Sequence, residues 1–121
     1  MASIGDRARA VEVTGGLAYV VDDPGGLHIV DISNPSDLRS VGFVETPGTA
    51  YGVALVGDYA YVADEDGGMH VVDVSLPPSP QIVRTVPVTR GAWGIWAIDE
   101  LVFLADANTL RIFNVSTPSS P

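Results

Sequence analysis

The segment most informative about the fold is Leu27-His28-Ile29-Val30-Asp31-Ile32-Ser33-Asn34-Pro35. It returns 42 residues later, where residues 69–77 read Met-His-Val-Val-Asp-Val-Ser-Leu-Pro. A third copy occupies residues 110–118, with Arg111 in place of the histidine and Asn114 in place of the aspartate. Self-similarity at a fixed period of about 20–50 residues is typical of repeat architectures, so the chain is read as three related units.

The similarity extends beyond that stretch. Tyr19-Val20 aligns with Tyr61-Val62, and Tyr51-Gly52-Val53 aligns with Trp93-Gly94-Ile95. Three copies of 42 residues would need 126 residues, whereas the chain has 121. We therefore expect a short N-terminal segment and three units, of which the third is incomplete: 1–8, 9–50, 51–92 and 93–121.

Each unit has the pattern of short antiparallel strands. Runs of β-branched and aromatic residues flank two-residue turns at Gly15-Gly16, Gly57-Asp58 and Asp99-Glu100, which is a hairpin signal. A second, glycine-bearing turn and a proline-rich corner follow, so each full unit has four strands. Four strands per repeat of about 40 residues predict the blade of an all-β β-propeller. A β-sandwich is the alternative, but it has no reason to repeat four strands in register.

These residues also carry a family resemblance. The strand at 27–32 followed by Ser33-Asn34-Pro35, with its copies at 69–77 and 110–118, resembles the signature of the LVIVD-repeat family. The resemblance covers almost the whole chain from Arg9 onward. It implies a propeller fold and favours an exported or cell-surface protein, although this chain shows no signal peptide. It implies no common catalytic residues.

Composition excludes several classes of function. The 121 residues include six arginines, no lysine and fifteen carboxylates, which gives a net charge of −9. Nucleic acids and anionic membrane surfaces need clustered basic residues, so neither is an expected partner. No apolar run reaches the length of about 20 residues that a membrane span needs. Cysteine is absent, which rules out a disulfide framework and thiolate metal sites.

Three blades do not close a ring, since propellers have about four to eight blades. We therefore expect an apolar blade face at each end, covered by a second copy of the chain. A homodimer gives six blades and is preferred; a homotrimer gives nine; an arc cut from a larger propeller is the remaining alternative. Ser3-Ile4-Gly5 echoes Ser40-Val41-Gly42 and could supply the outer strand that the neighbour's third blade lacks. The expected assembly residues are Ser3, Ile4, Gly5, Ile112 and Val115.

Two groups of residues are candidates for binding. The turns between the second and third strands carry carboxylates that could bind a cation or simply accept backbone hydrogen bonds, and the second reading is favoured. Aromatic and arginine side chains near the start of inner strands could contact a small ligand, or could pack between blades. The first group contains Asp22, Asp64, Asp66 and Asp106, and the second contains Tyr51, Arg90, Trp93 and Trp96.

The sequence lacks nucleophile motifs, phosphate loops and metal-binding helices, and no cofactor is expected. His28 and His70 lie on neighbouring blades and are read as structural. We therefore expect a non-catalytic module that assembles into a ring and serves as a scaffold for a protein or small ligand. Two alternatives remain: a hydrolase or lyase that uses carboxylates on one ring face, and a calcium-dependent surface adhesion module.

Overall fold

The fold was analysed in a computed structural model, which describes residues 7–23, 26–65, 68–87, 92–106 and 109–116. These residues form strands and turns and no helix. The strands are, in order, β1 (Arg7–Thr14), β2 (Leu17–Asp23), β3 (Gly26–Asp31), β4 (Arg39–Glu45), β5 (Ala50–Val56), β6 (Tyr59–Asp64), β7 (Gly68–Asp73), β8 (Gln81–Val86), β9 (Ala92–Ile98), β10 (Leu101–Asp106) and β11 (Leu110–Asn114).

The strands make three separate antiparallel sheets, each a meander in chain order. Blade 1 contains β1 to β4, blade 2 contains β5 to β8, and blade 3 contains β9 to β11. The four-stranded pattern predicted for the first two units is confirmed, with outer strands at β4 and β8. In the described part of the third unit the sheet has three strands, and residues 117–121 lie outside that part.

The hairpin turns fall where the repeat predicts them. Residues at the first turn position adopt positive φ in all three blades: 57° at Gly15, 57° at Gly57 and 53° at Asp99. Two-residue hairpin turns need this left-handed conformation, which glycine adopts freely and aspartate tolerates. The turns therefore set the same strand register in every blade, with Val13 opposite Ala18 and Leu55 opposite Ala60.

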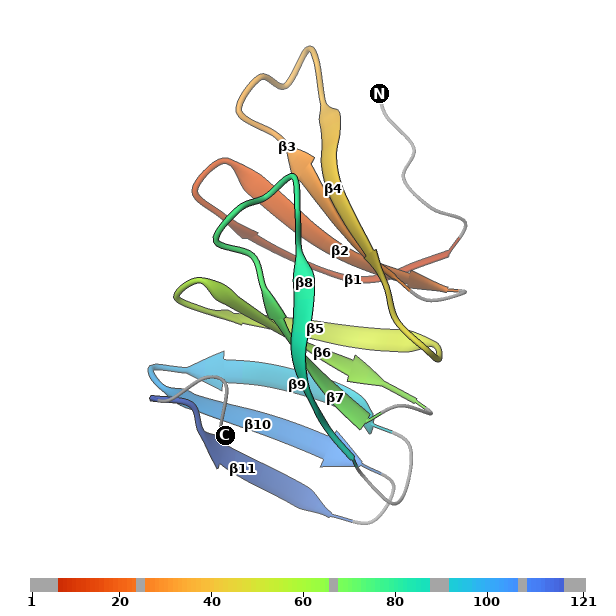
Figure 1. The fold of residues 1–121 in the computed structure, drawn as a ribbon, viewed down its shortest axis with the longest axis vertical. Coiled ribbons are helices and arrows are strands. Elements are labelled where there is room, and N and C mark those ends of the chain that lie inside the picture. The colour runs from red at the N-terminus through yellow and green to blue at the C-terminus, as the bar shows by residue number, and fades with distance from the viewer. Residues whose placement is uncertain (1–6, 24–25, 66–67, 88–91, 107–108, 117–121) are drawn as a thin grey trace.

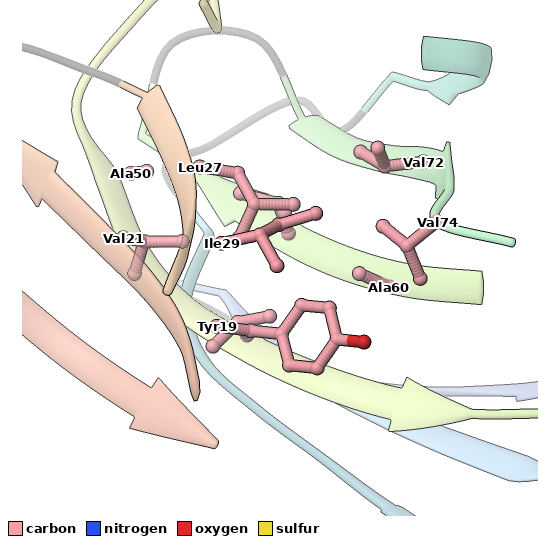
Figure 2. Packing of buried hydrophobic residues seen from close by; sticks show 10 residues of the cluster. Tyr19, Val21, Leu27, Ile29, Ala50, Ala60, Val72 and Val74 are labelled. Carbon is pink, nitrogen blue, oxygen red and sulfur yellow. The ribbon is translucent and has the colours of Figure 1, made fainter. Parts of the chain in front are cut away.

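The three blades stack one against the next, with blade 2 in the middle and the first and third sheets at the two ends of the arc (Figure 1). Inner strands adjoin across the stack, β1 beside β5 and β5 beside β9. One apolar core, shown in Figure 2, fills the joint between blades 1 and 2 and includes Tyr19, Ile29 and Val62. A second core fills the joint between blades 2 and 3 and includes Tyr61 and Leu104. This is the packing of consecutive propeller blades.

A glycine marks the outer edge of the first joint. A Cβ at Gly42 on β4 would lie 1.9 Å from the carbonyl oxygen of Pro77 and 3.2 Å from Cδ of Pro80. Both prolines belong to the corner between β7 and β8 of the next blade. Only glycine leaves room for that corner, so the proline-rich corner of one blade packs on the outer strand of the blade before it.

Tyr61 is expected to tolerate replacement by phenylalanine. Its side chain is fully buried, its hydroxyl finds no hydrogen-bond partner among the residues that the structure describes, and burial raises the pKa of the phenol to about 12. An unpaired buried hydroxyl costs about 1–3 kcal/mol, and Phe103 already occupies the equivalent position in blade 3. Urea unfolding of Tyr61→Phe should show an unchanged or higher free energy of unfolding. A loss above about 1 kcal/mol would reveal a hydrogen bond to that hydroxyl.

Candidate functional site

Because side chains alternate along a strand, each blade has two faces. One face of blade 1 packs on blade 2, and the equivalent face of blade 2 packs on blade 3. In blades 1 and 2 the residues on that face are core: Tyr19 and Ile29 in blade 1, and Tyr61 and Val71 in blade 2, are 0–5% exposed. Ile112 occupies the same place in blade 3, yet it is 57% exposed. The difference arises because no other described sheet covers blade 3 on that side.

We name this surface the blade 3 open face. Its members come from all three strands of the sheet, in cross-strand register. Trp96 pairs with Phe103, and Phe103 pairs with Ile112. The rings of Trp96 and Phe103 stack with their centroids 6.0 Å apart and their planes at 23°. The blade 3 open face consists of Trp96, Ile98, Leu101, Phe103, Leu110 and Ile112.

Blade 1 has a second exposed surface at the other end of the stack. Val11 and Val13 on β1 are each 57% exposed, whereas Val53, the counterpart of Val11 in blade 2, is 3% exposed against blade 1. Phe43 is also exposed and packs against the ring of His28, with centroids 4.6 Å apart. Ala18 and Val30 lie on the same side but are already buried. We name the surface formed by Val11, Val13, Val20, His28 and Phe43 the blade 1 open face.

The two histidines pair with aspartates of their own blades. His28 Nε2 lies 3.0 Å from Asp22 Oδ2, and His70 Nε2 lies 3.0 Å from Asp64 Oδ2. His70 Nδ1 also lies 2.9 Å from the Thr85 hydroxyl, and the Gly48 N–H donates to Asp64 Oδ2. The His70–Asp64 pair of blade 2 is buried, with both side chains at most 1% exposed. These contacts are consistent with the structural role that the sequence predicts for the histidines.

The polar residues that end the third strands stabilise turns. Asp31 and Asp73 each accept hydrogen bonds from the backbone N–H and the hydroxyl of the serine two residues later. Asn114 accepts the backbone N–H of Ser116 in the same way. The serine bonds to each carboxylate hold the pKa values of Asp31 and Asp73 below their ordinary value.

Asp73→Asn is expected to keep its turn and to weaken the acid sensitivity of the fold, while Asp73→Ala should lose the turn at every pH. A carboxylate with a lowered folded pKa stabilises above its unfolded pKa, and this stabilisation is lost as the pH falls through the folded value. Urea midpoints measured between about pH 5 and about pH 2.5 check this. An asparagine variant with the same acid loss as the native chain would contradict the assignment.

The acidic turns do not converge on one point. Asp22 and Asp64 bond to histidines of separate blades, and Asp106 Oδ1 accepts hydrogen bonds from the backbone N–H and the hydroxyl of Thr109. In the residues that the structure describes, no three His, Cys, Asp or Glu side chains gather as metal ligands would. Asp66, the fourth predicted member, lies outside those residues. Asp106 thus bonds within its own turn, as the favoured reading expects, whereas Asp22 and Asp64 bond to histidines of the following strand.

Every inner strand contains a β-bulge at the same repeat position. The ladder skips one residue between Ala8 and Ala10 in β1, between Ala50 and Gly52 in β5, and between Ala92 and Gly94 in β9. The extra residues are Arg9, Tyr51 and Trp93. Bulges re-aim a side chain and are enriched beside functional sites, so the repeat presents one off-ladder residue per blade.

The bulges bring Tyr51 into contact with residues that the sequence reading did not select. The Arg9 guanidinium lies over the Tyr51 ring, 4.8 Å from its centroid, and the Tyr51 hydroxyl lies 3.5 Å from Glu65 Oε2. The signal for Arg9 was its repeat alignment with Tyr51 and Trp93. The structure separates Trp96 from this group, because alternation puts it on the blade 3 open face. Arg90 lies outside the described residues.

The predicted assembly residues are also divided. Ile112 lies on the blade 3 open face. Val115 is 1% exposed in the core between blades 2 and 3, because alternation turns it toward blade 2. It therefore acts inside the chain rather than on an outer surface. Ser3, Ile4 and Gly5 lie outside the described residues.

The stacked antiparallel meanders define an all-β repeat protein with propeller-like blades. The LVIVD repeat model matches residues 5–46, 47–88 and 89–121. The chain therefore belongs to the LVIVD-repeat family, as the resemblance of its third strands predicted. No curated protein matches the sequence.

Solved structures share the fold at low sequence identity. The computationally designed Ika8 protein matches with a TM-score of 0.71 at 12% identity, over 89% of this chain and 33% of its own. The glutaminyl cyclase of Myxococcus xanthus matches with a TM-score of 0.69 at 18% identity, over 88% and 45%. The designed Ika4 protein matches with a TM-score of 0.58 at 8% identity, over 93% of each chain. The chain thus spans less than half of the first two, and the likeness concerns the fold alone.

Within the described ranges the structure has no helix with the length and hydropathy needed to cross a bilayer.

Proposed function

We propose that this chain is a self-assembling β-propeller module, in which the blade 3 open face of one copy docks on the blade 1 open face of the next. The single observation that carries the proposal is the exposure contrast within the repeat. Ile112 is 57% exposed where Ile29 and Val71 are fully buried, and Val11 is 57% exposed where Val53 is 3% exposed. Each open face matches a face that an adjoining blade covers elsewhere in the same chain.

The internal joints provide the template for this contact. Between blades 1 and 2, the row of Tyr19 and Ile29 packs in one core with Val53 and Val62. Phe103 and Ile112 are the blade 3 counterparts of the first pair, and Val11 and Val20 are the blade 1 counterparts of the second. A second copy of the chain therefore presents the surface that the repeat uses to cover such a row.

Energetics favour a closed ring over an open pair. If a joint buries about 500 Å² of apolar area, its burial contributes about 12 kcal/mol. Association costs about 4–15 kcal/mol, so one joint alone is marginal. A closed dimer makes two joints for one association step. We therefore favour a ring of two copies with six blades, with three copies and nine blades as the next arrangement.

Native mass spectrometry of the full chain over a dilution series tests the proposal. The expected result is a dimer, or next a trimer, that persists on dilution. Ile112→Arg should shift the population to monomer, because it would bury a charge in the proposed joint. In the monomer the arginine side chain remains hydrated, so the variant should still fold. Leu76→Arg is the matched control, because Leu76 is 68% exposed at the β7–β8 corner, outside both open faces. A native chain that is monomeric at every concentration would falsify the proposal.

A scaffold needs a surface for its partner, and the group of Arg9, Tyr51 and Glu65 is the best candidate for a ligand contact. It joins a cation and an aromatic ring at bulges of two inner strands with the Glu65 carboxylate, which follows β6. The hydrolase and calcium-adhesion alternatives would use the turn carboxylates. Asp22 and Asp64 are hydrogen-bonded to histidines of different blades, so no observation favours those alternatives over the scaffold.

A further inference from the structure

We infer that Trp96 is the anchor of the joint between copies and the residue that selects which blades may meet there. This inference rests on the proposed assembly and names the side chain that gives it affinity and order. Trp96 is 57% exposed on the blade 3 open face, whose other members are all apolar: Ile98, Leu101, Phe103, Leu110 and Ile112. A solvent-exposed tryptophan that shares a sheet face with exposed aliphatic side chains is the surface pattern of a protein–protein contact.

The repeat shows that this tryptophan is specific to the open end. Its counterparts in blades 1 and 2 are Glu12 and Ala54. Ala54 is 2% exposed and packs in the core between blades 2 and 3. The joint between blades 2 and 3 thus packs around the methyl group of Ala54, whereas blade 3 has the indole of Trp96 at the same repeat position. A surface that fits Trp96 differs in shape from one that fits Ala54.

The Trp96 side chain is preorganised by its contact with Phe103. Phe103 lies directly opposite Trp96 in the strand register, and the two rings stack with a 6.0 Å separation. Stacking restricts the rotamers of Trp96 before a partner arrives, which lowers the entropy cost of association. Tryptophan buries about 150–250 Å² and leads the residue types that dominate binding energy.

The opposing surface is found at the other end of the chain. In the internal joints, the inner strand of the following blade meets this row, and its residues at the two relevant positions are Val53 and Leu55 in blade 2 and Ile95 and Ala97 in blade 3. Their blade 1 counterparts are Val11 and Val13, which are both exposed. The residue at the second position differs in every blade, with Val13, Leu55 and Ala97, so the surface of blade 1 differs in shape from both internal ones. The blade 1 open face is therefore the surface that Trp96 of another copy meets, and the blades follow the order 1-2-3-1-2-3 around the ring.

A single-tryptophan chain tests the inference directly. Trp93→Phe leaves Trp96 as the only tryptophan, because the sequence contains two. Its fluorescence emission should move to shorter wavelength as concentration drives assembly, since Trp96 passes from water into an apolar joint. Emission that stays at the wavelength of an exposed indole while the mass doubles would overturn the assignment.

The energetic test is Trp96→Ala in the native chain. Sedimentation equilibrium should show a dissociation constant at least about 30-fold weaker, as expected for a binding hot spot. Trp96→Phe should recover part of the affinity. The monomer should fold as before, because the side chain is exposed there, and circular dichroism checks this. Leu76→Ala, the exposed control outside both faces, should leave the constant unchanged.

The outcomes separate the two proposals. A native chain that never assembles contradicts the proposed function and this inference together. A native chain that assembles, and that Ile112→Arg dissociates, supports the joint. If Trp96→Ala then leaves the dissociation constant within a few-fold of native, the joint stands and the anchor role of Trp96 is wrong.

Discussion

Replacing His70 with alanine is expected to lower the free energy of unfolding by about 3–5 kcal/mol. The imidazole is 1% exposed and bonds through its two nitrogens to the Asp64 carboxylate and the Thr85 hydroxyl. Its removal takes a hydrogen bond from a carboxylate that is itself fully buried and leaves a cavity between blades 1 and 2. Urea unfolding followed by circular dichroism measures the loss.

The repeat supplies a matched control for this variant. His28→Ala removes the equivalent hydrogen bond in blade 1, where the histidine and Asp22 side chains are 18% and 7% exposed. Phe43 replaces the threonine partner there, so one polar contact is lost instead of two. The expected cost is about 1–2 kcal/mol. Equal losses at both positions would show that burial between the blades adds nothing to the His70 network.

Gly42→Ala is expected to cost about 3 kcal/mol and to loosen the joint between blades 1 and 2. The added Cβ would lie 1.9 Å from the Pro77 carbonyl oxygen and 3.1 Å from its carbonyl carbon. Those atoms are backbone within a proline-rich corner, which cannot rotate aside as the end of a flexible side chain can. Thermal unfolding of the variant should show a lower midpoint, and amide exchange should rise on both sides of the joint.

Gly94→Ala is the control for that experiment. Gly94 also lies on a strand, but its nearest neighbour would be the Ala105 Cβ at 3.9 Å, which is an ordinary contact. Its stability should change by less than about 1 kcal/mol. If the two variants behave alike, the corner at Pro77 yields, and the tight contact at Gly42 does not determine how the blades pack.

Much of the fold follows from the repeat alone. The turns at Gly15-Gly16, Gly57-Asp58 and Asp99-Glu100 and the outer strands at β4 and β8 lie where the repeat predicts them. The bulges at Arg9, Tyr51 and Trp93 were not foreseen. A bulge changes which face each later residue occupies, and a single sequence offers no separate signal for it. Pairing across two strands, which only the fold provides, reveals the shift.

The candidate site was less predictable. Tyr51 and Trp96 are both aromatic and both lie on inner strands, so the sequence predicted that they belong to one site. In the structure, side-chain alternation places Trp96 on the blade 3 open face instead. Val115 and Ile112 likewise share one strand region and face opposite sides of the sheet. Arg9 and Glu65 come together with Tyr51 from two different blades. Contacts between blades depend on the angle at which the sheets stack, and spacing within one strand does not encode that angle.

The blade 3 open face consists only of uncharged side chains, while each copy carries a net charge of −9. Two copies that approach one another are therefore repelled by their overall charge and attracted only by the apolar contact. Dissolved ions screen the repulsion over a distance of about 10 Å at 0.1 M, and salting-out anions strengthen the apolar term. For the proposed assembly, ionic strength is consequently expected to act in the opposite sense to an interface built on ion pairs: dilute buffer should favour separate copies, and concentrated salt should favour their association.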